Sequence, residues 1–224
     1  MTRNVVITGG TGALGQAVVD RLQRDGARCH VTWKFEAELK HFTKGEGVTL
    51  HEVDCANESQ VEAFYAGLDS LDASIHIVGG FAMAGLLDTR RDDFVSMFEL
   101  NAVTAFLCCR ESARRMRSGG GGRIVNVAAR PAVQPTGGMI AYTTSKAAVA
   151  SLTQCLAEEL KDDAIQVNAI LPSVLDTPAN RRDMPKADFD SWPKLAEVAE
   201  AIAFLAGPEN RVTSGALVPV FGRA

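Results

Sequence analysis

The sequence predicts an α/β fold in which a seven-stranded parallel sheet is doubly wound, with helices on both faces. Short β-branched runs alternate with longer helical patterns along the chain, which is typical of this fold class. A glycine-rich turn follows the first run directly. With 224 residues, 46% of them hydrophobic, the chain is long enough for one domain over residues 1–224 with a sizeable core.

Each element is predicted from its own local pattern. The candidate strands are Val5 to Thr8, Arg28 to Trp33, Val48 to Val53, Ile75 to Val78, Arg123 to Ala128, Ile165 to Leu171 and Ala216 to Val220. The expected helices are Gly15 to Asp25, Ser59 to Leu68, Phe94 to Arg117, Tyr142 to Lys161 and Lys194 to Ala206. The stretch at about 173–193 is rich in Pro, Asp and Arg, and its length predicts a substrate lid.

Composition excludes several classes of function. The net charge of −4 provides no basic surface for nucleic acid or an anionic membrane. We see no run of about 18 apolar residues and no secretory signal, so a cytoplasmic protein is expected. The five cysteines contain no CxxC pair and are expected to be reduced and buried. The four histidines lack ligand spacing, so no metal site is predicted.

The glycine-rich turn Thr8-Gly9-Gly10-Thr11-Gly12-Ala13-Leu14-Gly15 lies between the first strand and the first helix. This context is required for the dinucleotide-binding turn of a Rossmann-type fold. Glycines allow a tight turn close to a pyrophosphate, which the amides at the helix N-terminus attract. The predicted cofactor-binding residues here are Gly9, Thr11, Gly12, Ala13, Leu14 and Gly15.

The end of the second strand indicates which dinucleotide binds. An NAD enzyme usually has Asp or Glu there, whereas this chain has Trp33 and Lys34. Lys34 can neutralise a 2′-phosphate, which favours NADP(H) over NAD(H). The alternative is a solvated Lys34, with Glu36 turning back to the ribose.

Asp54 and Cys55 follow the third strand and are predicted to contact the adenine through a carboxylate and a backbone amide. The alternative is that this segment only caps a helix through Asn57.

Tyr142 and Lys146 are four residues apart at the start of a helical stretch, so they share one helix face. A cation close to a phenol favours the phenolate and lowers the tyrosine pKa. The pair can then exchange a proton with a substrate near neutral pH.

Several motifs together resemble the short-chain dehydrogenase/reductase family: TGGTGALG, LNAVTAF, GRIVNV, AYTTSKAA and VNAILPSVLDTP. The resemblance implies that Tyr142 is the proton donor and that Lys146 lowers its pKa and holds the nicotinamide ribose. It implies that Asn101 positions Lys146 through a water. Gly79 and Gly80 correspond to a family turn next to the cofactor. Pro172, Val174 and Thr177 correspond to the segment that holds the nicotinamide carboxamide.

One departure from the family pattern concerns the substrate. The family has a catalytic Ser thirteen residues before the Tyr, and this chain has Ala129 there. Losing such a donor typically costs about 10²–10³ in rate, whereas an already polarised substrate needs it less. Ala129, GGMIAY, the lid sequence and SGALVPV most resemble the quinonoid dihydropteridine reductase subgroup, although Trp33 and Lys34 replace its usual acid.

The resemblance therefore predicts an NAD(P)H-dependent reductase of a small-molecule substrate. One alternative is a carbonyl reductase in which Ser145, Ser173 or Thr136 replaces the missing hydroxyl. Another is a weakly catalytic NADP(H)-binding sensor. In the lid, Trp192 is either a stacking platform for a pterin or part of the core. The long apolar helices also predict a homodimer or homotetramer.

Overall fold

The computed structural model describes residues 2–223 and contains a seven-stranded, all-parallel sheet with strand order β3-β2-β1-β4-β5-β6-β7. This confirms the predicted Rossmann-type doubly wound fold. The strands are β1 (Asn4–Thr8), β2 (Arg28–Trp33), β3 (Val48–Glu52), β4 (Ala73–His76), β5 (Gly122–Val127), β6 (Ile165–Pro172) and β7 (Leu217–Val220). All seven match predicted runs, with shifts of up to two residues at their ends.

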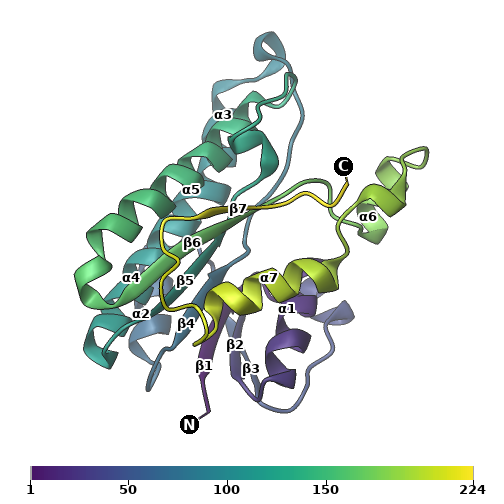
Figure 1. Ribbon diagram of the computed structural model, residues 1–224. Coiled ribbons are helices and arrows are strands. Elements are labelled where there is room, and N and C mark those ends of the chain that lie inside the picture. The colour runs from purple at the N-terminus through teal and green to yellow at the C-terminus, as the bar shows by residue number, and fades with distance from the viewer. Residues whose placement is uncertain (1, 224) are drawn as a thin grey trace.

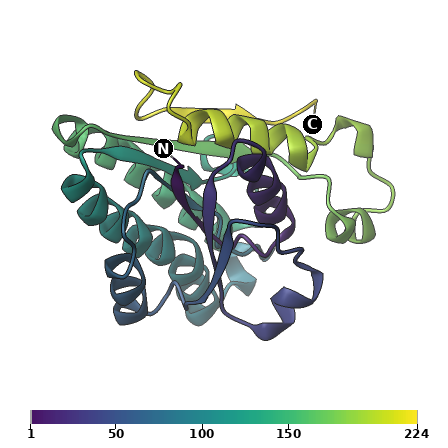
Figure 2. The same ribbon diagram turned by 90° about the horizontal axis from the view of Figure 1, so that it is seen from below.

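Helices cover both faces of the sheet (Figure 1). On one face lie α1 (Ala13–Arg24) and α7 (Leu195–Ala206), which pack against each other. The other face carries α2 (Glu58–Ala66), α4 (Thr104–Gly119) and α5 (Ile140–Glu159), with α3 (Arg91–Phe98) against α5. The view from below in Figure 2 shows the sheet between these two layers. The buried side chains form apolar clusters on both faces of the sheet, as expected for strands covered on both sides.

Among the local features that were not predicted, three lie in segments that form the site and its lid. The helix expected over Phe94 to Arg117 is interrupted by a π-helical turn, Glu99–Val103, between α3 and α4. A 3₁₀ turn, Glu36–His41, follows β2, and the lid contains the short helix α6 (Pro178–Asp183). A single π-helical turn does not interrupt the apolar pattern of the helices around it, and the other two segments are too short to carry a sustained apolar periodicity.

The sheet order places the site. β2 and β4 both pair with β1, and the chain leaves the sheet on opposite faces around these strands. Ligands of such folds bind outside the carboxyl ends of the strands at the point where the strand order reverses. The glycine-rich turn lies there, because it follows β1 directly.

Cys29, Cys55, Cys108 and Cys109 are free and buried, as predicted. The prediction was wrong for Cys155, which is free but exposed, because it lies on a face of α5 that does not pack on the sheet. Over residues 2–223, no helix has both the length and the apolar character needed to cross a bilayer. The same part of the chain holds no group of three or more His, Cys, Asp or Glu side chains arranged to bind a metal.

His76 at the end of β4 belongs to a buried polar network on the α2 and α4 side of the sheet. Its Nδ1 lies 2.9 Å from Asn126 Oδ1 and its Nε2 lies 2.8 Å from Ser74 Oγ. The Tyr65 hydroxyl is 2.9 Å from the same Ser74 oxygen. Burial lowers the pKa of His76 from 6.5 to about 4, so the folded protein holds this imidazole neutral.

We expect His76 to make stability depend on pH. Its folded pKa lies below the unfolded value, so the stabilisation is complete above pH 6.5 and is lost as the pH falls toward 4. This loss corresponds to about 3 kcal/mol. Urea unfolding at several pH values should show a smaller decline for His76→Gln than for wild type. The exposed His41 provides a control, because His41→Gln should keep the wild-type slope; equal slopes in all three proteins would contradict the assignment.

Candidate active site

The glycine-rich turn packs closely between β1 and the segment after β4. Gly9 has φ +66°, which disfavours other residues, and a Cβ there would lie 2.9 Å from the Val78 amide nitrogen. A Cβ at Gly15 would collide with the Gly9 carbonyl oxygen. Gly12 and Ala13 are exposed at the start of α1, so backbone amides there are accessible to a pyrophosphate. The turn therefore fits a dinucleotide.

Thr11 and Leu14 in the same turn have other neighbours. Thr11 Oγ1 donates a 2.6 Å hydrogen bond to Glu38 Oε2. The Leu14 side chain is buried in the apolar cluster under α1 and α7, so only its backbone can face a ligand.

Lys34, at the end of β2, is not simply solvated. Its Nζ lies 2.8 Å from Asp54 Oδ2, and Asp54 Oδ1 also accepts from the Ala56 amide at 3.0 Å. The Lys34 hydrogen bond contributes to lowering the pKa of Asp54. Two residues predicted for different parts of the cofactor thus form one ion pair at the sheet edge.

The residues after Asp54 bear on its two predicted roles, which were binding of the adenine and capping of the next helix through Asn57. The Cys55 thiol is buried, 3.7 Å from the Thr32 hydroxyl, so its side chain faces the core. Asn57 caps α2 by accepting from the Gln60 amide at 3.2 Å. The capping expected of Asn57 is present, and it is compatible with the role predicted for Asp54. Glu36 is exposed, and Glu38 is the acid that reaches back to the glycine-rich turn.

Asn101 and Lys146 meet at Gly79, where β4 has just ended. A Cβ at Gly79 would lie 2.5 Å from Asn101 Oδ1 and 3.1 Å from Lys146 Nζ. Asn101 Oδ1 accepts from the Gly80 amide at 2.9 Å, and its Nδ2 donates to the Gly80 carbonyl at 3.1 Å. The π-helical turn of Asn101 brings this side chain to the loop. A larger residue does not fit at position 79, because Asn101 and Lys146 fill the space that its side chain would need.

Lys146 is buried, and its Nζ donates a 2.8 Å hydrogen bond to the Val127 carbonyl at the end of β5. Burial lowers the pKa of Lys146 to about 8 and raises the pKa of Tyr142 to about 12. The pKa of Tyr142 is therefore raised, whereas the sequence predicted that it is lowered. The reason is that burial of the phenol dominates and Lys146 is directed to Val127. Tyr142 is consequently protonated at neutral pH, as a proton donor must be.

Phe81 is a neighbour of Tyr142 that sequence reasoning missed. The ring centroids are 4.9 Å apart in an edge-on arrangement, and Phe81 is 60% exposed. The loop that carries Phe81 also contacts the start of α5 through a bridge between Ala84 and Met139. The sequence could have indicated Phe81 as a site residue, because it directly follows Gly79 and Gly80, which were predicted to bind the cofactor. Tyr142 thus has an aromatic wall that is open to a ligand.

The structure places the three hydroxyls that were considered as replacements for the missing serine. Ala129 is buried just after β5. The buried Ser145 hydroxyl accepts from Asn101 Nδ2 at 3.0 Å and donates to the Tyr142 carbonyl at 2.8 Å. Ser173 donates to the Phe221 carbonyl at 2.8 Å, and Thr136 lies on an exposed loop. Ser145 and Ser173 thus already make structural hydrogen bonds.

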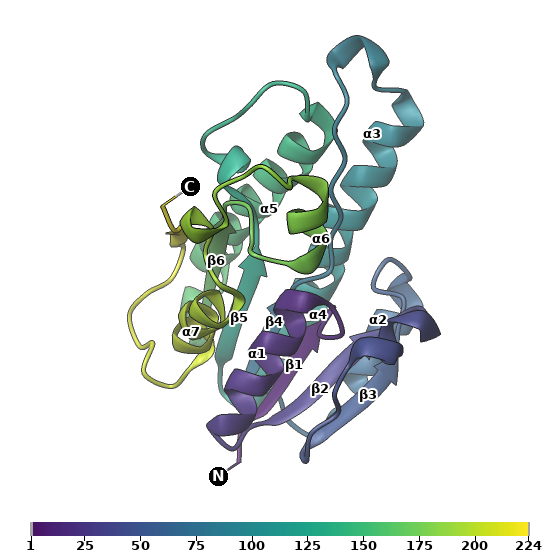
Figure 3. The same ribbon diagram turned by 90° about the vertical axis from the view of Figure 1, so that its right-hand side faces the viewer.

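The lid begins at the carboxyl end of β6, where Pro172 pairs with Val220. Val174 is half-buried after it, and the Thr177 hydroxyl accepts from the Asn180 amide at 3.1 Å to cap α6. Figure 3 looks from the side on which α6 projects. Trp192 at the lid's end is buried, with its ring centroid 5.0 Å from that of Phe189. This position agrees with the core-packing alternative for Trp192.

Asp176 connects the two ends of the lid. It accepts from Arg181 Nε at 2.5 Å and Nη2 at 2.9 Å, and from Lys194 Nζ at 2.8 Å. These hydrogen bonds hold the pKa of the Asp176 carboxyl well below its usual range. Arg181 also lies over the Phe189 ring, 4.7 Å from its centroid.

We expect Asp176→Asn to loosen the lid, because the charge that both cations share is removed. Limited trypsin digestion after Arg181, Arg182 or Lys186 should become about five- to tenfold faster, because the lid opens locally more often without these hydrogen bonds. Asp183→Asn changes the charge of an exposed lid residue and serves as the control. Equal digestion rates for both variants would show that Asp176 does not hold the lid.

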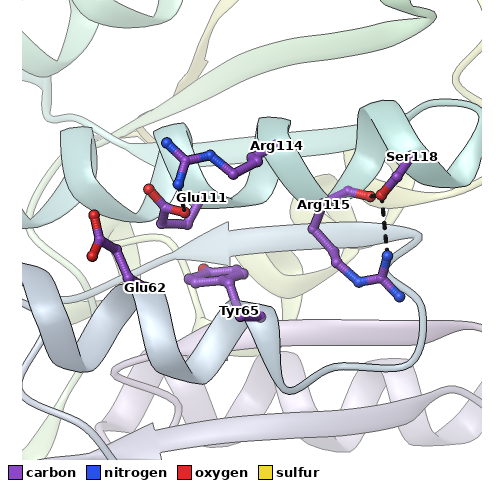
Figure 4. A pocket seen from close by; sticks show the side chains of 7 residues that line it. Glu62, Tyr65, Glu111, Arg114, Arg115 and Ser118 are labelled. Atoms are coloured by element: carbon purple, nitrogen blue, oxygen red, sulfur yellow. Dashed lines mark hydrogen bonds and ion pairs between the residues drawn. The ribbon is translucent and has the colours of Figure 1, made fainter.

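A separate groove of about 290 Å³ lies between α2 and α4 (Figure 4). It is lined by Glu62, Tyr65, Ala66, Glu111, Arg114, Arg115 and Ser118. These residues lie toward the carboxyl ends of the two helices, which return to the amino edge of the parallel sheet. The groove is therefore at the opposite edge from Tyr142 and is not part of the candidate site.

A family model described as short chain dehydrogenase matches residues 3–188. The chain belongs to the short-chain dehydrogenase/reductase family. It is an oxidoreductase of the NAD(P)-dependent type. A dihydropteridine reductase of Dictyostelium discoideum is 29% identical, with 97% of this chain and 94% of that protein covered. An NADPH-dependent aldehyde reductase-like protein of Arabidopsis thaliana is 28% identical over 98% and 93%.

Solved structures agree with this assignment. The structure titled ElxO with NADP bound superimposes with a TM-score of 0.91 at 25% identity, covering 99% of this chain and 98% of that one. A short-chain dehydrogenase/reductase of Serratia marcescens, solved as a double mutant, gives a TM-score of 0.86 at 28% identity over 99% and 97%. The family assignment agrees with the resemblance inferred from the motifs.

Proposed function

We propose that this short-chain dehydrogenase/reductase reduces a small, planar, already polarised substrate of the quinonoid dihydropterin class. The observation that carries the proposal is Ala129, a buried methyl side chain where the family serine is expected, together with the exposed Phe81 ring beside Tyr142. A conjugated substrate disperses the incoming electron pair, so it depends less on a hydroxyl that stabilises a localised oxyanion. An aromatic wall suits a planar ring. The likeness to a dihydropteridine reductase supports the same class.

We propose the following roles for the protein groups, which their contacts support. NAD(P)H, when bound, supplies the hydride. Tyr142 gives its phenolic proton to the reduced substrate, and the Lys146 ammonium stabilises the phenolate that remains. Asn101 and the Val127 carbonyl fix the surroundings of Lys146. The glycine-rich turn and Gly80 hold the cofactor, with Pro172, Val174 and Thr177 proposed at its nicotinamide end.

We further propose that NADP(H) is favoured over NAD(H). Lys34 is the cation at the end of β2 and is 46% exposed, so it can turn from Asp54 to a 2′-phosphate. The NADP bound in the ElxO structure and the NADPH dependence of the aldehyde reductase-like protein of Arabidopsis thaliana support this preference.

An aldehyde or ketone reductase is the second candidate, favoured by the same Arabidopsis relative. Initial rates of NADPH and NADH oxidation separate the two. We expect fast turnover with quinonoid dihydropterin and slow turnover with a panel of ketones. Ala129→Ser should raise the ketone rates by about 10–10²-fold, because it restores one donor to the oxyanion.

The neighbouring buried residue provides a control, since Ala128→Ser adds the same hydroxyl one position away and should not raise ketone turnover. Wild-type ketone rates equal to the pterin rate, with no gain in Ala129→Ser, would favour the carbonyl reductase. No oxidation of either cofactor with any substrate would favour a dinucleotide-binding sensor.

A further inference from the structure

Both ends of the lid are bound by one short segment, residues 221–223, which directly follows β7 and is called the anchor segment below. Figures 1 and 2 both place it beside the lid that carries α6. Where the lid begins, Ser173 Oγ donates a 2.8 Å hydrogen bond to the Phe221 carbonyl. Where the lid ends, the Arg223 amide donates a 2.8 Å hydrogen bond to the Ser191 carbonyl. Two lid ends that are far apart in sequence thus share one support.

Gly222, in the middle of the anchor segment, packs closely against the end of the lid. A Cβ at this position would lie 2.6 Å from the Ser191 carbonyl oxygen and 2.9 Å from the Pro193 nitrogen. Both are backbone atoms, which cannot move aside as a flexible side chain can. Gly222 also has φ +64°, a conformation that disfavours other residues. Any larger residue there must therefore displace the lid or the anchor segment.

The anchor segment is also connected to the candidate site. The Arg130 guanidinium lies over the Phe221 ring, 5.0 Å from its centroid, and Arg130 directly follows Ala129. On the lid side, Val174 comes directly after the anchored Ser173 and is proposed to lie at the nicotinamide end of the cofactor. The position of the anchor segment therefore affects where this part of the lid lies.

We propose that residues 221–223 are positioning residues, which act through the lid by holding both of its ends over the substrate and the nicotinamide. For the effect on substrate, this inference rests on the proposed reductase function. A loosened anchor segment should weaken the binding of substrate, because the closed lid is then populated less. It should leave the adenosine end of the cofactor unaffected, since that end is proposed to bind at the glycine-rich turn and the end of β2.

Gly222→Ala tests the role of the close contact. The added Cβ collides with the backbone of the lid, so we expect the KM for quinonoid dihydropterin to rise by about five- to tenfold while kcat changes by less than about twofold. Trypsin digestion within the lid should become faster by a similar factor. The affinity for 5′-AMP, measured by titration calorimetry, should stay within about twofold, which a general loss of structure would not allow.

Gly26→Ala is the matched control. Gly26 lies between α1 and β2 with φ +74°, and a Cβ there would meet nothing within 4 Å. This variant therefore introduces a similar backbone strain without a collision, and should keep the wild-type KM and the wild-type rate of lid digestion. Thermal unfolding of both glycine variants verifies that each is folded.

Ser173 tests the other end of the lid. Ser173→Ala removes the hydrogen bond to the Phe221 carbonyl, and should raise the substrate KM and the rate of lid digestion by about threefold, as expected for one hydrogen bond. Ser173→Thr keeps a hydroxyl and should restore both values to within about twofold of wild type.

The possible outcomes separate this inference from the proposed function. A higher KM and faster lid digestion in Gly222→Ala and Ser173→Ala, absent in Gly26→Ala, support the role of the anchor segment. Wild-type values in folded Gly222→Ala overturn that role, and if this variant does not fold, wild-type values in Ser173→Ala overturn it. Wild-type protein that oxidises neither NADPH nor NADH with any substrate contradicts the reductase proposal, and the digestion rates then decide the role of the anchor segment alone.

Discussion

Tyr142→Phe is expected to lower turnover by about 10²–10⁴-fold, the contribution typical of a positioned proton donor. The substitution removes only the hydroxyl. The ring remains beside Phe81, with centroids 4.9 Å apart in the wild type, so the aromatic wall of the site is preserved. The phenol is protonated at neutral pH because burial raises its pKa to about 12. Its loss therefore removes the proton and not the binding surface.

Two measurements separate this loss from a loss of structure. Initial rates with NADPH and the best substrate give kcat, and titration calorimetry gives the affinity for NADPH, which should stay within about threefold because the hydroxyl acts at the reacting end. The chain has two tyrosines, so Tyr65→Phe is a matched control. It removes a buried hydroxyl that lies 2.9 Å from Ser74 Oγ, and should reduce stability without reducing kcat. If Tyr142→Phe turned over as fast as wild type, Tyr142 would not be the proton donor.

Lys146→Met is expected to lower kcat by about 10²-fold or more, because in the proposed mechanism it removes the cation that stabilises the developing phenolate. Methionine fills the buried position, but it leaves the Val127 carbonyl without the 2.8 Å hydrogen bond from Nζ. This lost bond should also cost about 1–3 kcal/mol of stability.

The pH profile gives a second readout for Lys146. Burial lowers the pKa of its ammonium to about 8, so the charged form decreases as the pH rises through 8. Wild-type kcat should fall over that range, whereas Tyr142, with a pKa of about 12, remains protonated. Lys146→Met should lack the break near pH 8.

A lysine outside the site serves as the control for this profile. Lys161 lies just beyond α5, where it forms an exposed ion pair with Glu158, and Lys161→Met should keep both the rate and the break. An unchanged break near pH 8 in Lys146→Met would assign the titration to another group.

The sequence by itself determined the features that depend on short stretches of chain. β-branched runs and helical patterns repeat within a few residues of each other, so the seven strands and the order of the elements were predictable. The glycine-rich turn was recognisable because it lies between one strand and one helix. The placement of Tyr142 and Lys146 on one helix also follows from spacing, since residues four apart share a helix face.

Only the tertiary structure decided which groups meet across the site. Glu38 and Thr11 are 27 residues apart, and Asn101 lies 44 residues before Ser145, to which it donates. Neither contact has a local periodic signal, and the π-helical turn that directs Asn101 to Gly80 has none either. Burial raises the pKa of Tyr142, whereas the spacing to Lys146 predicted a lower one. Burial depends on everything packed around a group, and spacing along the chain does not encode it.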